Sequence, residues 1–297
     1  MDAAIRTHYE QVLGHVYVNP LERCNLRCKI CYTRKTDPIL KESEILGFIH
    51  RYKQVHPVSV VTFCGGEVFA LPYFTRLVNA LSKQGILIQI ITNGTIDKLS
   101  EFHEPNSINL IVSIDGLRKY HDKNRGKGNF TKSLKFLRKA GEMGFHSEIF
   151  SIVTKQNYPD IGLFEQYLHK TLNQNISVTY HPRKPPAYLL HHPVSNIFGD
   201  INGFDFVSHE EMHDLFRNRK TFPPKELGCY QIALASDGKV YGCCEGTIPL
   251  GQMDDDIQLL LKKLKDRLVI WNSAKAPKHC LGCSQPDFVC GIKRYIS

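Results

Sequence analysis

The segment from Arg23 to Tyr32, RCNLRCKICY, gathers three cysteines at positions 24, 28 and 31. Thiolates bind soft metal ions and iron–sulfur clusters, whereas a structural zinc site takes four protein ligands. Residues 33–42 contain neither cysteine nor histidine. Three thiolates in so short a loop suit three corners of a [4Fe–4S] cube whose fourth iron stays open, an arrangement typical of catalysis. The alternative is a zinc knuckle completed from a distance, with His15 and Cys64 nearest in the sequence.

The cysteine loop follows the first of six apolar segments of strand length. These segments are rich in Val and Ile and nearly continuous, as expected for parallel strands covered on both faces. The predicted strands are 15–20, 58–64, 86–93, 108–115, 147–154 and 176–182, and helical patterns cover 41–54, 73–84, 129–143, 158–172 and, more briefly, 95–104. This alternation predicts an α/β fold with a parallel sheet, either doubly wound or curled into a partial barrel.

Polar residues and glycines follow several of the predicted strands. In both folds ligands collect at the carboxyl ends of parallel strands. Glycine has no Cβ and so allows the backbone to approach a ligand closely or to adopt a positive φ. The alternative for the polar residues is a structural role, because Asp-Gly is a common turn pair and an Asn or Thr at a strand end often caps a turn. The residues at these ends are Gly65, Gly66, Glu67, Asn93, Ser113, Asp115 and Thr154.

The pattern changes after residue 183. An irregular stretch leads to a predicted helix over 208–220, with Ser208 as N-cap and Glu211 completing a capping box. A hairpin turning at Asp237-Gly238 and a helix over 254–271 follow. We therefore predict a core over 1–207, a linker helix over 208–228 and a small third unit over 229–297.

These features together resemble the radical S-adenosylmethionine (SAM) superfamily. Its signature, C-x3-C-x2-C, is matched by Cys24, Cys28 and Cys31, and FCGGEV resembles its Gly-Gly-Glu motif after the second strand. VSIDGLRKYHDKNRGKGNF is similar to the stretch after the fourth strand in members with a C-terminal auxiliary cluster. The resemblance implies a partial (β/α)6 TIM-like barrel with a small C-terminal auxiliary-cluster domain, built of a β-hairpin plus a helix.

The resemblance also implies a [4Fe–4S] cluster on the three catalytic cysteines and SAM chelated to its open iron. One electron then cleaves SAM to a 5′-deoxyadenosyl radical that abstracts hydrogen from a C–H bond. Glu67 is expected to hold the SAM ammonium, Ser113 and Asp115 the ribose or carboxylate, and Arg125 the carboxylate. The full set expected at the cofactor is Ile30, Tyr32, Gly65, Gly66, Glu67, Asn93, Ser113, Asp115, Arg125 and Thr154.

The sequence departs from the superfamily pattern in three places. Ile30 stands where an aromatic residue is usual, Val68 where proline is common, and Cys64 where a hydroxyl residue is frequent. Ile30 is still expected to pack on the adenine. Cys64 is interpreted as a buried strand-end thiol, with a place near the reaction centre as the alternative.

Six further cysteines lie after residue 228. Their spacing resembles the auxiliary-cluster domains of the SPASM and abbreviated twitch types. Because six cysteines cannot complete two [4Fe–4S] sites, we expect one auxiliary cluster, with a zinc ribbon as the alternative. The expected ligands are Cys229, Cys243, Cys280 and Cys283, with Cys244 and Cys290 as substitutes.

Composition sets the compartment and the partners that we expect. The first residues carry acids and lack an apolar core, unlike a signal peptide, so a cytoplasmic location with reduced cysteines is predicted. No apolar run is long enough to span a membrane. The net charge of +9 is compatible with a nucleic-acid partner, but the basic stretch 117–141 has few aromatics for base stacking, so this partner is not favoured. A reductant such as flavodoxin or ferredoxin is implied by the resemblance.

The favoured function is radical oxidation or cyclisation of a peptide, a protein side chain or a natural-product intermediate, assisted by the auxiliary cluster. With about 14 residues before His15, leader-peptide recognition is expected from a separate protein or from 184–206. One alternative keeps the radical chemistry on RNA or a phosphorylated compound. Another is a zinc-stabilised binding protein without catalysis.

Overall fold

In a computed structural model of the chain, described residues comprise 13–31, 33, 35–172, 176–182, 203–205, 207–217, 231–244, 248–273 and 292–296. Tyr32 and four of the six C-terminal cysteines, at 229, 280, 283 and 290, lie outside them. No helix within the described ranges is both long and apolar enough to cross a lipid bilayer.

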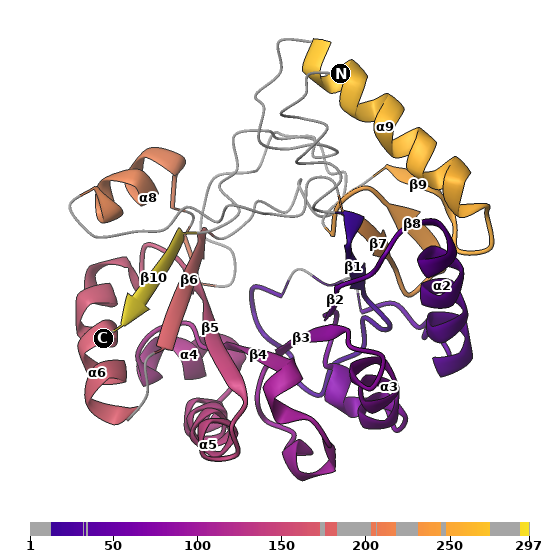
Figure 1. Cartoon of the computed structure of the whole chain (residues 1–297). Helices are drawn as coiled ribbons and strands as arrows, with labels where there is room; N and C mark the ends of the chain where they lie inside the picture. The colour runs from indigo at the N-terminus through magenta and orange to yellow at the C-terminus, as the bar shows by residue number, and fades with distance from the viewer. Residues whose placement is uncertain are drawn as a thin grey trace.

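Six parallel strands form a curved sheet, and neighbours in the sequence are neighbours in space. Figure 1 shows them side by side as an open arch. The strands are β1 (His15–Val18), β2 (Val60–Phe63), β3 (Leu87–Thr92), β4 (Ile108–Ser113), β5 (His146–Val153) and β6 (Ile176–Pro182). The predicted partial (β/α)6 barrel is confirmed, because this order is that of a barrel rather than of a doubly wound sheet.

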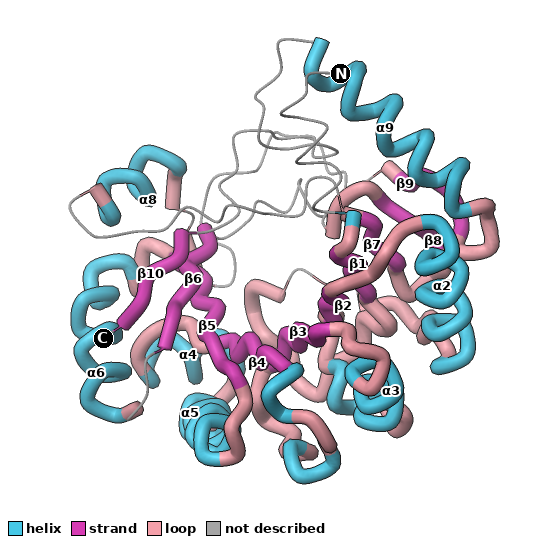
Figure 2. The backbone as a smooth tube through the Cα atoms, viewed as in Figure 1, coloured by secondary structure: helices cyan, strands magenta, loops and turns pink. Residues whose placement is uncertain are grey.

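Helices cover the outer side of the arch, as the tube in Figure 2 shows. They are α2 (Glu42–Val55), α3 (Phe74–Ser82), α4 (Arg118–Arg125), α5 (Asn129–Glu142) and α6 (Ile161–Thr171). Short 3-10 turns are η1 (Val68–Ala70), η2 (Leu99–Glu101), η3 (Pro105–Ser107) and η4 (Tyr158–Asp160). The helical stretch expected over 95–104 is thus a single turn, η2. The sequence prediction missed α4, because its eight residues are almost wholly polar and show no apolar stripe.

Strands from the C-terminal region extend both edges of the parallel sheet. β7 (Ile232–Leu234) runs parallel to β1 and continues through β8 (Lys239–Tyr241) to β9 (Pro249–Gln252). At the other edge β10 (Ile292–Ile296) pairs antiparallel with β6. The expected hairpin at Asp237-Gly238 is confirmed, with Gly238 at φ +80°. The boundary at residue 229 stays a prediction, because the hairpin shares a continuous sheet with the core.

Two helices accompany these strands. α8 (His209–Phe216) begins at Ser208, whose hydroxyl accepts from the Glu211 backbone in the expected capping box. α9 (Ile257–Ser273) follows β9 and contacts α2.

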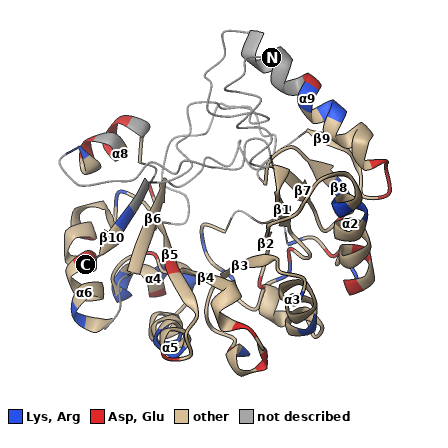
Figure 3. Ribbon diagram, in the orientation of Figure 1, with Lys and Arg blue, Asp and Glu red and all other residues tan. Residues whose placement is uncertain are grey.

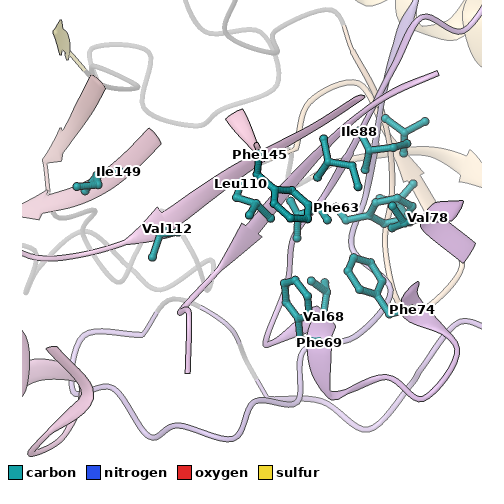
Figure 4. Packing of buried hydrophobic residues seen from close by; sticks show 14 of the residues in the cluster. Phe63, Val68, Phe69, Phe74, Val78, Ile88, Leu110, Val112, Phe145 and Ile149 are labelled. Carbon is teal, nitrogen blue, oxygen red and sulfur yellow. The ribbon is translucent and has the colours of Figure 1, made fainter. Parts of the chain in front are cut away.

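The core fills the space between the sheet and its helices. Figure 4 shows Phe63 of β2, Phe69 of η1 and Phe74 of α3 in one cluster, with Phe63 and Phe74 edge to face at 5.3 Å between ring centroids. Phe69 also meets Phe102 and Phe136 edge to face. Charged residues lie mainly on the helices and loops, as Figure 3 shows, so the strands carry the apolar interior. Aromatic burial of this kind fixes the turn after β2.

Candidate active site

A cavity of about 200 Å³ lies at the carboxyl ends of the parallel strands, and the three thiols of Cys24, Cys28 and Cys31 line it. Tyr17 of β1 and Phe150 of β5 also line it. Further lining residues include Ile30, Gly65, Gly66, Asn93, Ser113 and Arg125. Six residues expected at the cofactor therefore share one cavity with the cysteines.

The two glycines after β2 seat the start of the cysteine loop. Gly66 N donates to Leu21 O at 2.9 Å, and a Cβ on Gly66 would lie 1.8 Å from Arg23 O. Gly65 has φ +129°, and its Cβ would lie 2.2 Å from Leu21 O. Glycine is required here because two stretches of backbone touch, so its first task is to hold this loop.

Glu67 is fully buried and does not line the cavity. Its Oε1 accepts from Thr92 Oγ1 at 2.8 Å and from Phe69 N at 3.2 Å, and its Oε2 accepts from Asn93 N at 2.8 Å. Burial raises the pKa of this carboxyl, against the opposing effect of those donors. In this arrangement Glu67 joins the turn after β2 to the end of β3. Its expected contact with the SAM ammonium stays a prediction.

Asn93, at the end of β3, reaches the first cysteine. Its Nδ2 donates to Asn25 Oδ1 at 2.9 Å and lies 3.7 Å from Cys24 Sγ. Its Oδ1 accepts from Thr95 N at 2.9 Å. The side chain thus caps the turn after β3 and also contacts the cysteine loop, so the two interpretations offered by the sequence are compatible.

Asn124, which the sequence prediction overlooked, fixes the other half of the cysteine loop. Its Oδ1 accepts from Ile30 N at 3.2 Å, and its carbonyl accepts from Lys29 N at 3.0 Å. Its Nδ2 donates to Asp115 Oδ2 at 2.7 Å. The only signal in the sequence was its position beside Arg125, because polar residues in a short helix carry no periodic pattern.

Asp115 and Arg125 form a buried bidentate ion pair, with Nε–Oδ2 at 2.6 Å and Nη2–Oδ1 at 3.0 Å. Asp115 does not line the cavity, whereas Arg125 does. Burial works against the Asp115 charge, but the guanidinium outweighs it and lowers the pKa of this carboxyl. Likewise the carboxylate raises the pKa of Arg125 against the effect of burial. Asp115 therefore orients a cation beside the cavity, and its expected contact with SAM stays a prediction.

Of the remaining predicted residues, some line the cavity and others do not. Ser113 lines the cavity, whereas Thr154 is buried outside its lining, where its N donates to Asn157 Oδ1 at 2.8 Å and closes a turn. Cys64 is buried, and burial raises the pKa of its thiol, as expected of a strand-end thiol. Tyr32 lies outside the described residues.

The donor set fits an iron–sulfur cluster, because three thiolates from one short loop that line one cavity are the ligands such a cluster takes. Within the described ranges no three His, Cys, Asp or Glu side chains stand close enough to enclose one ion. Burial raises the pKa of the Cys28 thiol, and the nearby Arg125 opposes this effect. The three thiols would thus hold such a cluster with Arg125 stabilising their charge.

Of the expected auxiliary ligands, Cys243 and Cys244 are described. Both follow β8, Cys243 buried and Cys244 exposed. The antiparallel register, which pairs Ala233 with Tyr241, brings the chain before β7 and the chain after β8 to one end of the hairpin. The ligand set stays a prediction because Cys229, Cys280, Cys283 and Cys290 lie outside the described residues.

The comparisons with curated proteins find partial matches. The chain is 26% identical over 148 residues to the sporulation killing factor maturation protein SkfB of Bacillus subtilis, covering 47% of this chain and 35% of SkfB. It is 26% identical over 186 residues to a GTP 3′,8-cyclase of Limosilactobacillus fermentum, covering 58% of this chain and 54% of the cyclase. The chain thus spans about half or less of these relatives, and their activities do not transfer with the match.

The fold and the family are clearer. The structure of anSMEcpe with bound AdoMet and Cp18Cys peptide matches with a TM-score of 0.68 at 19% identity, covering 91% of this chain and 88% of anSMEcpe. The likeness shows a shared fold over nearly the whole chain. The model of the Radical SAM superfamily matches residues 18–167, just over half of the chain, which include the cysteine loop and the Gly-Gly-Glu turn. The chain therefore belongs to the radical SAM superfamily, whose members use a [4Fe–4S] cluster and SAM.

Proposed function

We propose that this protein cleaves SAM reductively and removes a hydrogen atom from a peptide, a protein side chain or a natural-product intermediate. The observation that carries the proposal is the convergence of three thiols from one short loop on a single cavity, beside a buried arginine, in a radical SAM chain. When bound, the cluster and SAM supply a 5′-deoxyadenosyl radical that attacks a C–H bond.

The residues of the chain have distinct tasks in this proposal. Arg125, held by Asp115, offers its outward donors to the SAM carboxylate. Ser113 offers its hydroxyl to the ribose, and Ile30 lies against the adenine. Asn93 and Asn124 hold the two halves of the cysteine loop at fixed positions. Such pre-positioning matters because a misplaced reacting atom costs large factors in rate.

In this proposal the region after residue 228 holds the group that oxidises the substrate radical. One auxiliary [4Fe–4S] cluster on Cys229, Cys243, Cys280 and Cys283 would accept an electron from the substrate radical, which favours oxidation or ring formation. Supporting this assignment, the hairpin carrying Cys243 pairs directly with β1, whose Tyr17 lines the cavity. A reductant such as flavodoxin or ferredoxin would provide the first electron.

A peptide substrate is favoured by two of the comparisons. SkfB is a maturation protein for a killing factor, and anSMEcpe was solved with a peptide. The likeness to GTP 3′,8-cyclase supports a second candidate, radical chemistry on a phosphorylated compound or RNA. Steeply salt-dependent binding to mixed-sequence RNA would favour RNA, and its absence would remove that candidate.

The test begins with anaerobic reconstitution using iron and sulfide. We expect roughly eight irons per chain for two [4Fe–4S] clusters, and roughly four if only the first is present. SAM and dithionite should then yield 5′-deoxyadenosine. Bound zinc in place of iron, or no 5′-deoxyadenosine from the reconstituted protein, would refute the proposal.

Two variants test the division of labour between the clusters. Cys28→Ala should abolish SAM cleavage, because it removes a ligand of the first cluster. Cys280→Ala should keep SAM cleavage but block product formation from a peptide encoded beside the gene. Equal SAM cleavage in both variants would contradict separate tasks for the two cysteine sets.

A further inference from the structure

Lys35 lines the same cavity as the three thiols. Its Nζ is buried and has no hydrogen-bond partner within the described part of the chain. Its backbone has φ +58°, the left-handed region that residues other than glycine rarely adopt. Such backbone persists where the surroundings fix it, and it concentrates at ligand-binding positions.

The segment around Lys35 is tied down on its C-terminal side. Thr36 donates from its N and its Oγ1 to Glu22 Oε2, at 3.2 and 2.8 Å. Asp37 Oδ1 pairs with Arg23 Nη2 at 2.7 Å, and Ile39 bridges to Leu21. These contacts join the chain after Lys35 to the chain before Cys24. They therefore hold the segment that carries Lys35 in place at the cavity.

Among the described residues, no Asp or Glu carboxylate pairs with the Lys35 ammonium. No Asp or Glu is among the residues that line the cavity. Asp115 is engaged by Arg125 and Asn124, and Glu67 is engaged by backbone and hydroxyl donors. A buried ammonium without a partner is unfavourable. Besides the three cysteine thiolates, which line the same cavity and already face Arg125, a bound molecule is the natural source of its counter-charge.

We propose that Lys35 binds a carboxylate of the substrate, an inference that rests on the proposed function for the identity of this cavity. The lining of this cavity is more apolar than polar and includes Tyr17, Ile91, Phe150 and Ile152. A single ammonium beside such a wall suits a carboxylate carried on an apolar body, such as an acidic group next to a hydrophobic one in a peptide. A phosphate dianion binds better where several donors converge on it. Arg125 already donates two hydrogen bonds to Asp115, so the cavity favours a carboxylate.

The test uses three small probes of similar shape: benzoate, its neutral analogue benzamide, and phenyl phosphate. Dissociation constants are measured by calorimetry on the reconstituted, SAM-loaded protein. The variants are Lys35→Met, which keeps an unbranched stem and so leaves the backbone cost unchanged, and Lys35→Arg, which keeps the charge. Lys127→Met is the matched control, since Lys127 is exposed and outside the cavity lining.

We expect benzoate to bind about tenfold more tightly than benzamide, as one charge-assisted hydrogen bond allows. Lys35→Met should lose this preference, while Lys35→Arg and Lys127→Met keep it, and SAM affinity and iron content stay at wild-type values in all three.

Four results would overturn the proposal. Benzoate and benzamide of equal affinity in the wild type would show no carboxylate site. A preference for phenyl phosphate over benzoate would assign Lys35 to phosphate. A tenfold loss of SAM affinity in Lys35→Met would assign it to the SAM carboxylate, and a changed cluster absorption spectrum would assign it to the thiolates. Formation of 5′-deoxyadenosine in the same samples reports separately on the proposed function.

Discussion

Arg125 lines the cavity because Asp115, ten residues earlier, grips its guanidinium with both carboxylate oxygens. The pair is almost fully buried, with 13% and 4% of the two side chains exposed. Asp115 follows β4 and Arg125 ends α4, so the pair closes the chain segment that joins these elements. It also links the barrel to the cysteine loop, since Asn124 contacts both Asp115 and Ile30.

Asp115→Asn should lower the free energy of unfolding by about 3–5 kcal/mol, because it leaves the Arg125 charge buried without its counter-ion. SAM affinity should fall as well, since Arg125 loses its orientation. Denaturant unfolding and calorimetric titration with SAM measure the two effects. Asp266→Asn, which removes an exposed acid paired with Lys262 in α9, should change little. Comparable losses in both variants would contradict a special role for the buried pair.

Gly66→Ala should displace the cysteine loop, because the new Cβ would overlap the backbone oxygen of Arg23. We expect a loss of about 1–3 kcal/mol in stability and a clear fall in iron bound per chain after reconstitution. Gly47→Ala is the control. It lies within α2 with its nearest neighbour 3.8 Å away, so it should gain about 0.5–1 kcal/mol. Normal iron content in Gly66→Ala would show that the loop tolerates the shift.

Asn124→Ala should reduce iron binding, because Ile30 N and Asp115 lose the partner that joins them. The expected cost in stability is about 1–3 kcal/mol. Asn79→Ala also removes two side-chain hydrogen bonds, to Glu101 O and from His103 N, in a part of α3 outside the cavity lining. It should lose stability without losing iron. If both variants bind iron equally, the hydrogen bonds that Asn124 makes to the cysteine loop do not affect cluster binding.

Acid should destabilise the protein without cofactors through two buried histidines. Burial lowers the pKa values of His15 and His121 to about 4. Between that value and the ordinary pKa near 6.5, the unfolded chain binds more protons than the folded one. This stability is therefore present above about pH 6.5 and is lost as the pH falls towards 4, at about 2 kcal/mol for each histidine by pH 5.

Urea unfolding at pH 7 and pH 5 measures this loss. His15→Gln should remove about half of it, whereas His50→Gln, which changes an exposed residue of α2, should keep the full pH dependence. An unchanged dependence in His15→Gln would show that His15 is protonated within the fold.

The cysteine loop, the six β/α repeats and the Gly-Gly-Glu turn are predictable from the amino-acid sequence alone. Each of these depends on the spacing and periodicity of residues close together in the chain, which are visible in the amino-acid sequence. It also located the hairpin at Asp237-Gly238 and the cap at Ser208, because turn and cap residues act on their immediate neighbours.

Which strand-end residues face the cavity depends instead on how the whole chain packs. Ser113 ends β4 and lines it, but Asp115 lies beyond the strand, where side-chain alternation no longer fixes direction, and it turns to Arg125 instead. Asn124 and Lys35 gain their places from contacts with residues far along the chain or from a left-handed backbone. The pairing of β7 with β1 and of β10 with β6 was equally hidden. These outcomes depend on which distant groups satisfy one another's charges and hydrogen bonds once buried, and that is a property of the packed chain rather than of any local pattern.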